Sequence, residues 1–159
     1  MPKQEKRQLT EEEKKAIAKA KDELRAYRYN IRYIEEKLRD IEETKALAVK
    51  VTPTLSPTKT NSNNISNDKI GDSIARLEQL KDISDYKIKQ LLMKKFDIDD
   101  KIESLDTPYR DLLFYRYTRA NEWTDVAKKI GYSESHTKGV LHAEALYLYS
   151  KIKNNTRKY

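Results

Sequence analysis

The side chains best suited to recognise another molecule gather in one short stretch near the C-terminal end of the chain. Ser135, His136 and Lys138 supply hydrogen-bond donors close together, and His142 follows one helical turn later. A helix that turns these groups outward can place donors against base edges in a DNA major groove about 12 Å wide. Gly139 has two interpretations: it lets the helix backbone approach a groove closely, or it is a neutral surface position. The predicted DNA-binding residues of this stretch are Ser135, His136, Lys138, Gly139 and His142.

The C-terminal tail supplies a different kind of contact, which carries charge and no sequence information. After Glu144 the chain has no acidic residue. Cations in such a tail neutralise DNA phosphates and strengthen binding to any sequence, although an ordinary solvated terminus is the alternative interpretation. We predict phosphate contacts from Lys151, Lys153, Arg157 and Lys158.

Catalytic and metal-binding chemistry find little support in the sequence. The chain has no cysteine, and His136 and His142 lie too far apart for the i, i+4 histidine pair that binds zinc on one helix face. No P-loop, glycine-rich turn or nucleophile motif is present. Paired carboxylates such as Glu35-Glu36 stand among lysines and arginines, as on a solvated helix face. We therefore expect no enzyme activity, no cofactor and no metal site.

The composition favours long helices over a compact globule. Of 159 residues, 37% are apolar and 37% are charged, against usual values of about 45–50% and about 25%. The 3 glycines and 4 prolines are too few for a many-stranded β fold. A formal net charge of +7 fits a polyanionic partner. The apolar runs are too short for a membrane span or a signal peptide, so we expect an intracellular protein with no membrane partner.

Two long helices with heptad seams dominate the predicted architecture. A first helix is predicted over residues 11–51: Thr10 with Glu13 forms a capping box at its start, and apolar residues recur at steps of three and four from Ile17 to Ile41, before a polar break. Turn-forming residues fill 52–67, which we predict to be a linker and the least ordered internal stretch. The same stepping returns over 68–105. The matched lengths predict a long antiparallel, coiled-coil-like helical hairpin.

An apolar row beside the second seam would stay uncovered in a single hairpin. A surface stripe of this length is normally covered by another chain. The alternative is cover by the C-terminal domain or by residues 1–10, which we predict to be a flexible N-terminus. We predict a homo-oligomer that associates through Leu80, Ile83, Leu92 and Phe96.

Residues 106–152 are predicted to form a separate helix-turn-helix domain, followed by a basic tail over 153–159. Its first helix is expected to carry Pro108 at the first helical position. A short second helix ends at Gly131, which tolerates a left-handed backbone, and Ser133 caps the third helix. The inward positions of the third helix are predicted to be Thr137, Leu141, Ala145, Leu148 and Ile152.

Three parts of this domain resemble the promoter-reading helix-turn-helix of bacterial sigma factors, their region four. They are residues 110–117, residues 123–133 with the motif Val-Ala-x-x-Ile-Gly-x-Ser, and Ala145-Leu146. Together with the linker and the helix restart at residues 68–71, the whole of residues 30–150 resembles the ArpU-like and RinA-like activators of late genes from phages and prophages of Gram-positive bacteria. The resemblance implies a transcription regulator in the cytoplasm of a bacterial host. Its implied partners are double-stranded DNA and, further, bacterial RNA polymerase.

Two other functions fit the same pattern. A protein-interaction module acting on host RNA polymerase is favoured by the balance of basic and acidic residues over 106–146. A packaging protein like a small terminase subunit also joins a helix-turn-helix to a helical hairpin, but such proteins generally place the DNA-binding unit first. The preferred prediction is sequence-specific DNA binding through residues 133–142.

Overall fold

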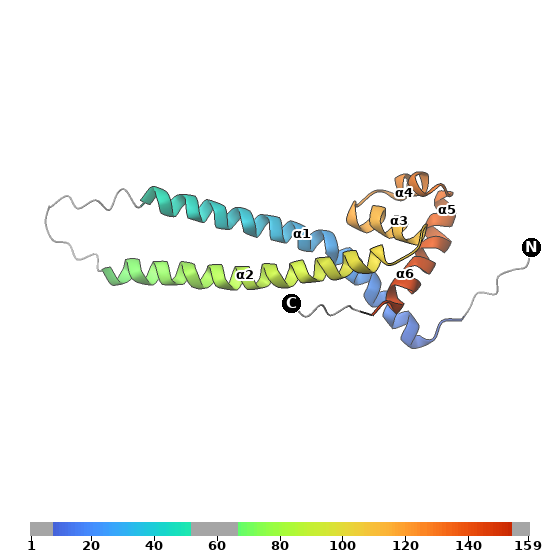
Figure 1. Ribbon diagram of the computed structural model, residues 1–159, viewed down its shortest axis with the longest axis horizontal. Helices are drawn as coiled ribbons and strands as arrows, with labels where there is room; N and C mark the ends of the chain where they lie inside the picture. The colour runs from blue at the N-terminus through green and yellow to red at the C-terminus, as the bar shows by residue number, and fades with distance from the viewer. Residues whose placement is uncertain (1–7, 52–66, 154–159) are drawn as a thin grey trace, which may run out of the picture. The chain divides into compact units, whose positions relative to one another are not determined.

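The computed structural model describes residues 8–51 and 67–153, and every regular element in these ranges is helical. The predicted all-α class is therefore confirmed. Figure 1 shows the helices along the chain. They are α1 (Glu11–Val51), α2 (Asn67–Glu103), α3 (Tyr109–Leu113), the π-helical turn η2 (Phe114–Thr118), α4 (Trp123–Ile130), α5 (Glu134–His136), the π-helical turn η3 (Thr137–Leu141) and α6 (His142–Lys151).

Several predictions fall outside the described residues. They concern the linker over 52–66, most of the N-terminal segment and the tail after Lys153. No helix in the part of the chain that is described is long and apolar enough to cross a membrane.

The chain divides into two compact units, and each of the two long helices lies partly in one unit and partly in the other. Unit 1 takes Met1–Asn30 and Lys94–Tyr159, and unit 2 takes Ile31–Met93. This division differs from the predicted boundary at residue 106, because the start of α1 and the end of α2 belong to the same unit as α3 to α6. A heptad seam indicates which face of a helix is apolar but not which helix covers that face. From the sequence pattern, the start of α1 was therefore expected to pack against α2 alone.

The start of α1 is fixed by the capping box and by a contact from α6. The Thr10 N–H donates to Glu13 Oε2 at 3.0 Å, and the Glu13 N–H donates to Thr10 Oγ1 at 3.2 Å. Lys151 Nζ and the Tyr147 hydroxyl also donate to Glu13 Oε1, at 3.1 and 3.3 Å. The Thr10 amide first, and then Lys151, lower the pKa of Glu13 to about 2. One carboxylate thus joins the two ends of unit 1.

The core of unit 1 draws on α1, α2 and the short helical elements other than α5, which Figure 1 shows gathered together. Lys101 of α2 is buried in this core, where its Nζ lies 3.3 Å from Glu23 Oε1 of α1 and 5.1 Å from the centre of the Tyr149 ring of α6. A buried lysine requires such partners, because an unpaired charge away from water is costly. The buried apolar residues are Ala20, Leu24, Tyr27, Ile98, Ile102, Leu105, Leu112, Leu113, Tyr117, Val126, Ala127, Leu141, Ala145, Leu146 and Tyr149.

Two details of the C-terminal helices differ from the prediction. Helix α3 begins at Tyr109, so Pro108 is the residue before the helix and not its first residue. Leu148 was expected to face inward but is 38% exposed, while Leu146 and Tyr149 are buried. The reason is the second packing partner of α6: Tyr149 turns toward Lys101 of α2, which places Leu148 on the outer side.

Unit 2 holds fewer buried side chains in its described part. Ile34 of α1 and Ile88 of α2 are buried, and Lys87 Nζ lies 4.6 Å from the centre of the Tyr33 ring. Leu38, in contrast, is about half exposed. These contacts show that the two apolar seams meet within this unit.

Candidate nucleic-acid interface

A tight turn joins α4 to the helical segment that carries the predicted recognition residues. Gly131 ends α4 in the left-handed conformation, with φ 78°, and its N–H donates to the Ala127 carbonyl at 3.0 Å. The Ser133 side chain then caps α5 by accepting the His136 N–H at 3.2 Å. The Thr137 hydroxyl donates to the Ser133 carbonyl at 2.8 Å. The predicted α4 end at Gly131 and the predicted cap at Ser133 are both confirmed by this geometry.

Contacts between α4 and α5 hold the start of this segment in place. The Thr124 hydroxyl donates to Glu134 Oε2 at 3.0 Å. The His136 ring stacks on Tyr132, with 5.6 Å between the ring centres. From α5 the chain continues through η3 into α6, since Thr137 and His142 at the two junctions keep right-handed helical backbone angles. The turn and the helical segment therefore form one ordered element.

Most of the predicted recognition residues lie on the outer side of that element. Ser135, His136, Lys138 and Gly139 are exposed, while Thr137 is fully buried beneath them. A side-chain carbon built on Gly139 would meet nothing within 4 Å. The fold itself therefore does not require glycine at this position.

His142 is placed differently from the prediction. It was expected to point outward, but its Nε2 lies 2.8 Å from the Tyr117 hydroxyl and its ring meets the edge of Trp123, with 4.8 Å between ring centres. Burial first, and then the positive charges of Lys21, Arg116 and Arg25, lower the pKa of His142 to about 4. The imidazole is thus neutral near pH 7 and is held inside the unit.

The predicted phosphate contacts of the tail are only partly in view. Lys151 is engaged by Glu13 and lies over the Tyr147 ring, with 5.0 Å to the ring centre. Lys153 is exposed. Arg157 and Lys158 lie outside the described residues. Among the predicted tail cations that lie in the described residues, Lys153 is therefore the one that is exposed and makes no ion pair.

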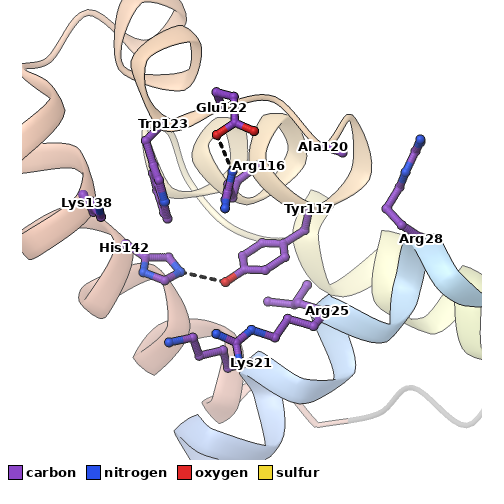
Figure 2. Close-up of a pocket in the computed structure, with 11 residues that line it drawn as sticks. Lys21, Arg25, Arg28, Arg116, Tyr117, Ala120, Glu122, Trp123, Lys138 and His142 are labelled. Atoms are coloured by element: carbon purple, nitrogen blue, oxygen red, sulfur yellow. Dashed lines mark hydrogen bonds and ion pairs between the residues drawn. The ribbon is translucent and has the colours of Figure 1, made fainter.

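An open cleft of about 560 Å³ in unit 1 brings together residues that sequence analysis did not connect. Figure 2 shows the side chains from α1, η2, α4, η3 and α6 that line it. Arg116 lies 4.7 Å from the centre of the Trp123 ring, and its Nη1 donates to the Asn121 carbonyl at 2.8 Å. The cleft is lined by Lys21, Leu24, Arg25, Arg28, Arg116, Tyr117, Ala120, Glu122, Trp123, Lys138 and His142.

Three of the cleft cations come from α1, which sequence analysis had assigned to a hairpin and not to a binding site. Lys21, Arg25 and Arg28 are spaced by four and three residues, so they share one face of the helix. That spacing was visible in the sequence. Nothing in the sequence, however, indicated that the C-terminal helices lie beside this face.

The predicted association residues are exposed to different degrees. Ile83 is 65% exposed and Phe96 is 52% exposed, whereas Leu92 is partly covered. The side chain of Leu80 lies outside the described residues. Ile83 and Phe96 are thus large apolar side chains that the described part of the chain leaves in contact with water.

Within the described ranges, no three histidine, aspartate or glutamate side chains gather as a group able to hold a metal ion. Comparisons of the chain with family models, with curated proteins and with solved structures give no match. The functional argument therefore depends on the residues and their geometry.

Proposed function

We propose that this protein is a sequence-specific DNA-binding transcription regulator of phage or prophage genes. The supporting observation is the outward placement of Ser135, His136 and Lys138 on a capped helical segment that follows a tight glycine turn. In this proposal α4 and the segment from α5 to α6 form a helix-turn-helix. The phage origin follows from the sequence resemblance alone.

The exposed donors suit the chemistry of the major groove. Lys138 can donate to the O6 and N7 acceptors of guanine, and Ser135 can pair with bases or with phosphate oxygens. The open space around Gly139 allows the helix backbone to approach the groove closely. Thr137 and Leu141, buried on the other side, fix the angle at which the segment presents these groups.

Association through α2 belongs to the same proposal. Helix-turn-helix proteins commonly bind two half-sites as dimers, which raises affinity and specificity together. The exposed Ile83 and Phe96 provide apolar area for such a contact. Light scattering on the full chain tests this part, with Ile83→Asp and Phe96→Asp expected to lower the mass to that of a monomer. A wild-type monomer at tens of micromolar would contradict it.

A protein-interaction module acting on RNA polymerase remains the second candidate. Residues 106–146 carry as many acidic as basic side chains, and this balance favours modest intrinsic DNA affinity. In that case the exposed donors on the helical segment would contact protein and not bases.

Selection from a library of randomised duplexes tests the DNA-reading proposal. The full chain should enrich one motif, and Lys138→Ala should lower affinity for that motif by about ten- to a hundredfold while changing binding to random DNA much less. Lys89→Ala, which removes an exposed lysine of α2, is the matched control and should bind as the wild type does.

Gly139→Ala gives a second readout that does not depend on lost stability. Alanine should stabilise the helical segment by about 0.5–1 kcal/mol, because glycine is the weaker helix former and the added methyl has free space. The same methyl should weaken binding to the enriched motif if the backbone approaches the groove. Retention of wild-type binding by both variants would move the polymerase-contact function to first place.

A further inference from the structure

We propose that the cleft between α1 and the C-terminal helices of unit 1 binds phosphates of a DNA backbone, which makes α1 part of the DNA interface. This inference rests on the proposed function and adds to it a second contact surface. Lys21, Arg25 and Arg28 of α1 would form that surface together with Arg116 and Lys138.

The charges that line the cleft are almost all of one sign. Five basic side chains and one acidic side chain, Glu122, surround it. Glu122 reaches only Arg116, at 3.9 Å, and its own side chain is largely exposed. A concave surface with this excess of positive charge concentrates anions from solution.

Four of the five cleft cations make no ion pair within the described residues. Other cations of unit 1, such as Lys95, Lys101 and Lys151, pair with a carboxylate at 3.3 Å or less, and Arg116 of the cleft lies 3.9 Å from Glu122. In the described ranges, Lys21, Arg25 and Lys138 make no such pair, and Arg28 donates only to the Thr118 carbonyl, at 3.3 Å. Cations that the fold leaves uncompensated on one surface are available for an external anion.

The spacing of the cations fits a backbone better than a single small anion. Lys21 to Arg28 covers about 10 Å of α1 at 1.5 Å per residue. One DNA strand carries about three phosphates over the same axial length, at 3.4 Å each. A lone phosphate is held best by donors that converge on one point, whereas these three cations form a row.

Lys138 links the row to the proposed reading segment. It lines the cleft and is also one of the exposed donors of η3. A strand whose bases face Lys138 would therefore bring its phosphates toward the α1 side of the cleft. Because α1 supplies further cations, the near balance of acidic and basic residues over 106–146 then limits DNA affinity less.

Two double variants of α1 test the proposal on the full chain. Arg25→Ala with Arg28→Ala removes two exposed cations from the cleft, and Lys15→Ala with Lys19→Ala removes two exposed cations from another face of the same helix. The cleft variant should lose about tenfold in affinity for a random-sequence duplex near 0.1 M salt. Its plot of log affinity against log salt should flatten by about two charges, with a slope near 0.9 per phosphate contact. The control variant should match the wild type in both quantities.

The source of the phosphate is tested with Trp123, the only tryptophan of the sequence and a residue of the cleft. Its fluorescence should respond to micromolar duplex and should respond to inorganic phosphate only at far higher concentration. A response to submillimolar inorganic phosphate, with none to duplex, would overturn the proposal in favour of a small-anion site. Equal duplex binding by the cleft variant and the wild type would overturn this inference and leave the proposed function standing. Absence of any duplex binding by the wild type would contradict both.

Discussion

The two parts of α1 carry the same apolar repeat and have very different surroundings. In unit 1 Leu24 is 0% exposed, whereas in unit 2 Leu38 is 48% exposed. The two leucines stand two heptads apart in the same apolar repeat, so they lie on the same face of α1. The difference teaches that a heptad seam specifies a face, and that the helices packed against that face decide how much stability the seam contributes.

The charged residues of the two units differ in the same way. In unit 1 the ion pairs Lys101–Glu23 and Lys151–Glu13 join residues far apart in the sequence. In unit 2 the described ion pair, Lys37–Asp40, joins residues three apart on one helix. Long-range pairs fix tertiary structure, while pairs on one helix support only that helix. Unit 1 is therefore where substitutions should matter most.

The largest expected difference between the units comes from removing a leucine. Leu24→Ala should lower the free energy of unfolding by about 3 kcal/mol, because it opens a cavity in a fully buried site. Leu38→Ala should cost less than about 1 kcal/mol, since about half of this side chain is in water. Urea titrations followed by Trp123 fluorescence and by circular dichroism measure both. Equal losses in the two variants would show that unit 2 is covered in solution, as by a second copy of the chain.

A smaller difference is expected when one partner of an ion pair is removed. Glu23→Ala should cost about 2 kcal/mol, because it leaves the buried Lys101 ammonium without its carboxylate. Asp40→Ala removes the partner of Lys37 on an exposed helix face and should cost less than about 0.5 kcal/mol. Thermal unfolding of the two variants makes the comparison. A near-neutral Glu23→Ala would mean that water reaches Lys101.

Much of this fold could be predicted from the sequence, because local signals determine it. The capping box at Thr10, the left-handed Gly131 and the serine cap at Ser133 are each set by a few neighbouring residues, and each is found in the structure. The boundary of the C-terminal unit was not predictable in this way. It depends on the contact between Glu13 of α1 and Lys151 of α6, two residues more than a hundred positions apart.

The candidate site likewise combines features that the local sequence predicts with features that depend on distant contacts. The exposure of Ser135 and Lys138 follows from the helical period, because Thr137 and Leu141 occupy the inward positions of the segment. The position of His142 does not follow from that period, because Tyr117 and Trp123 draw its ring inward. The cleft cations of α1 were missed for the same reason, since their role depends on a partner from a distant segment.

The pH dependence of stability sharpens the comparison further, because His142 belongs to unit 1. Its pKa of about 4 lies below the ordinary 6.5, so between these values the unfolded chain binds more protons. Unit 1 should therefore lose stability as the pH falls from about 6.5 to about 4, by about 1–2 kcal/mol after allowance for the partial exposure of the ring. His142→Gln should remove this loss, while the exposed His136→Gln should keep it. Urea midpoints at pH 7 and pH 5 measure the effect.

The two histidine variants would also reveal a loss of stability at acidic pH that has another cause. The pKa of Glu13 is lowered to about 2 from 4.5, so its contribution is lost only below about pH 4.5 and does not overlap the upper part of the window. A decline between pH 6.5 and 5 that survives in His142→Gln would therefore contradict the assignment to this histidine.

The smallest expected effect is a gain in stability confined to unit 1. Ala120, between η2 and α4, has φ 55°, in the left-handed region that costs a non-glycine residue about 1 kcal/mol or more. Ala120→Gly removes that strain but adds freedom to the unfolded chain, so the net gain should be about 0.5 kcal/mol. Alanine-to-glycine change at Ala143, an exposed position within α6, is the control and should destabilise by about 0.5–1 kcal/mol, because glycine is a poor helix former. Trp123 fluorescence during urea unfolding follows both variants within unit 1. A loss of stability in Ala120→Gly as large as that at Ala143 would show that residue 120 adopts ordinary helical or extended angles in solution.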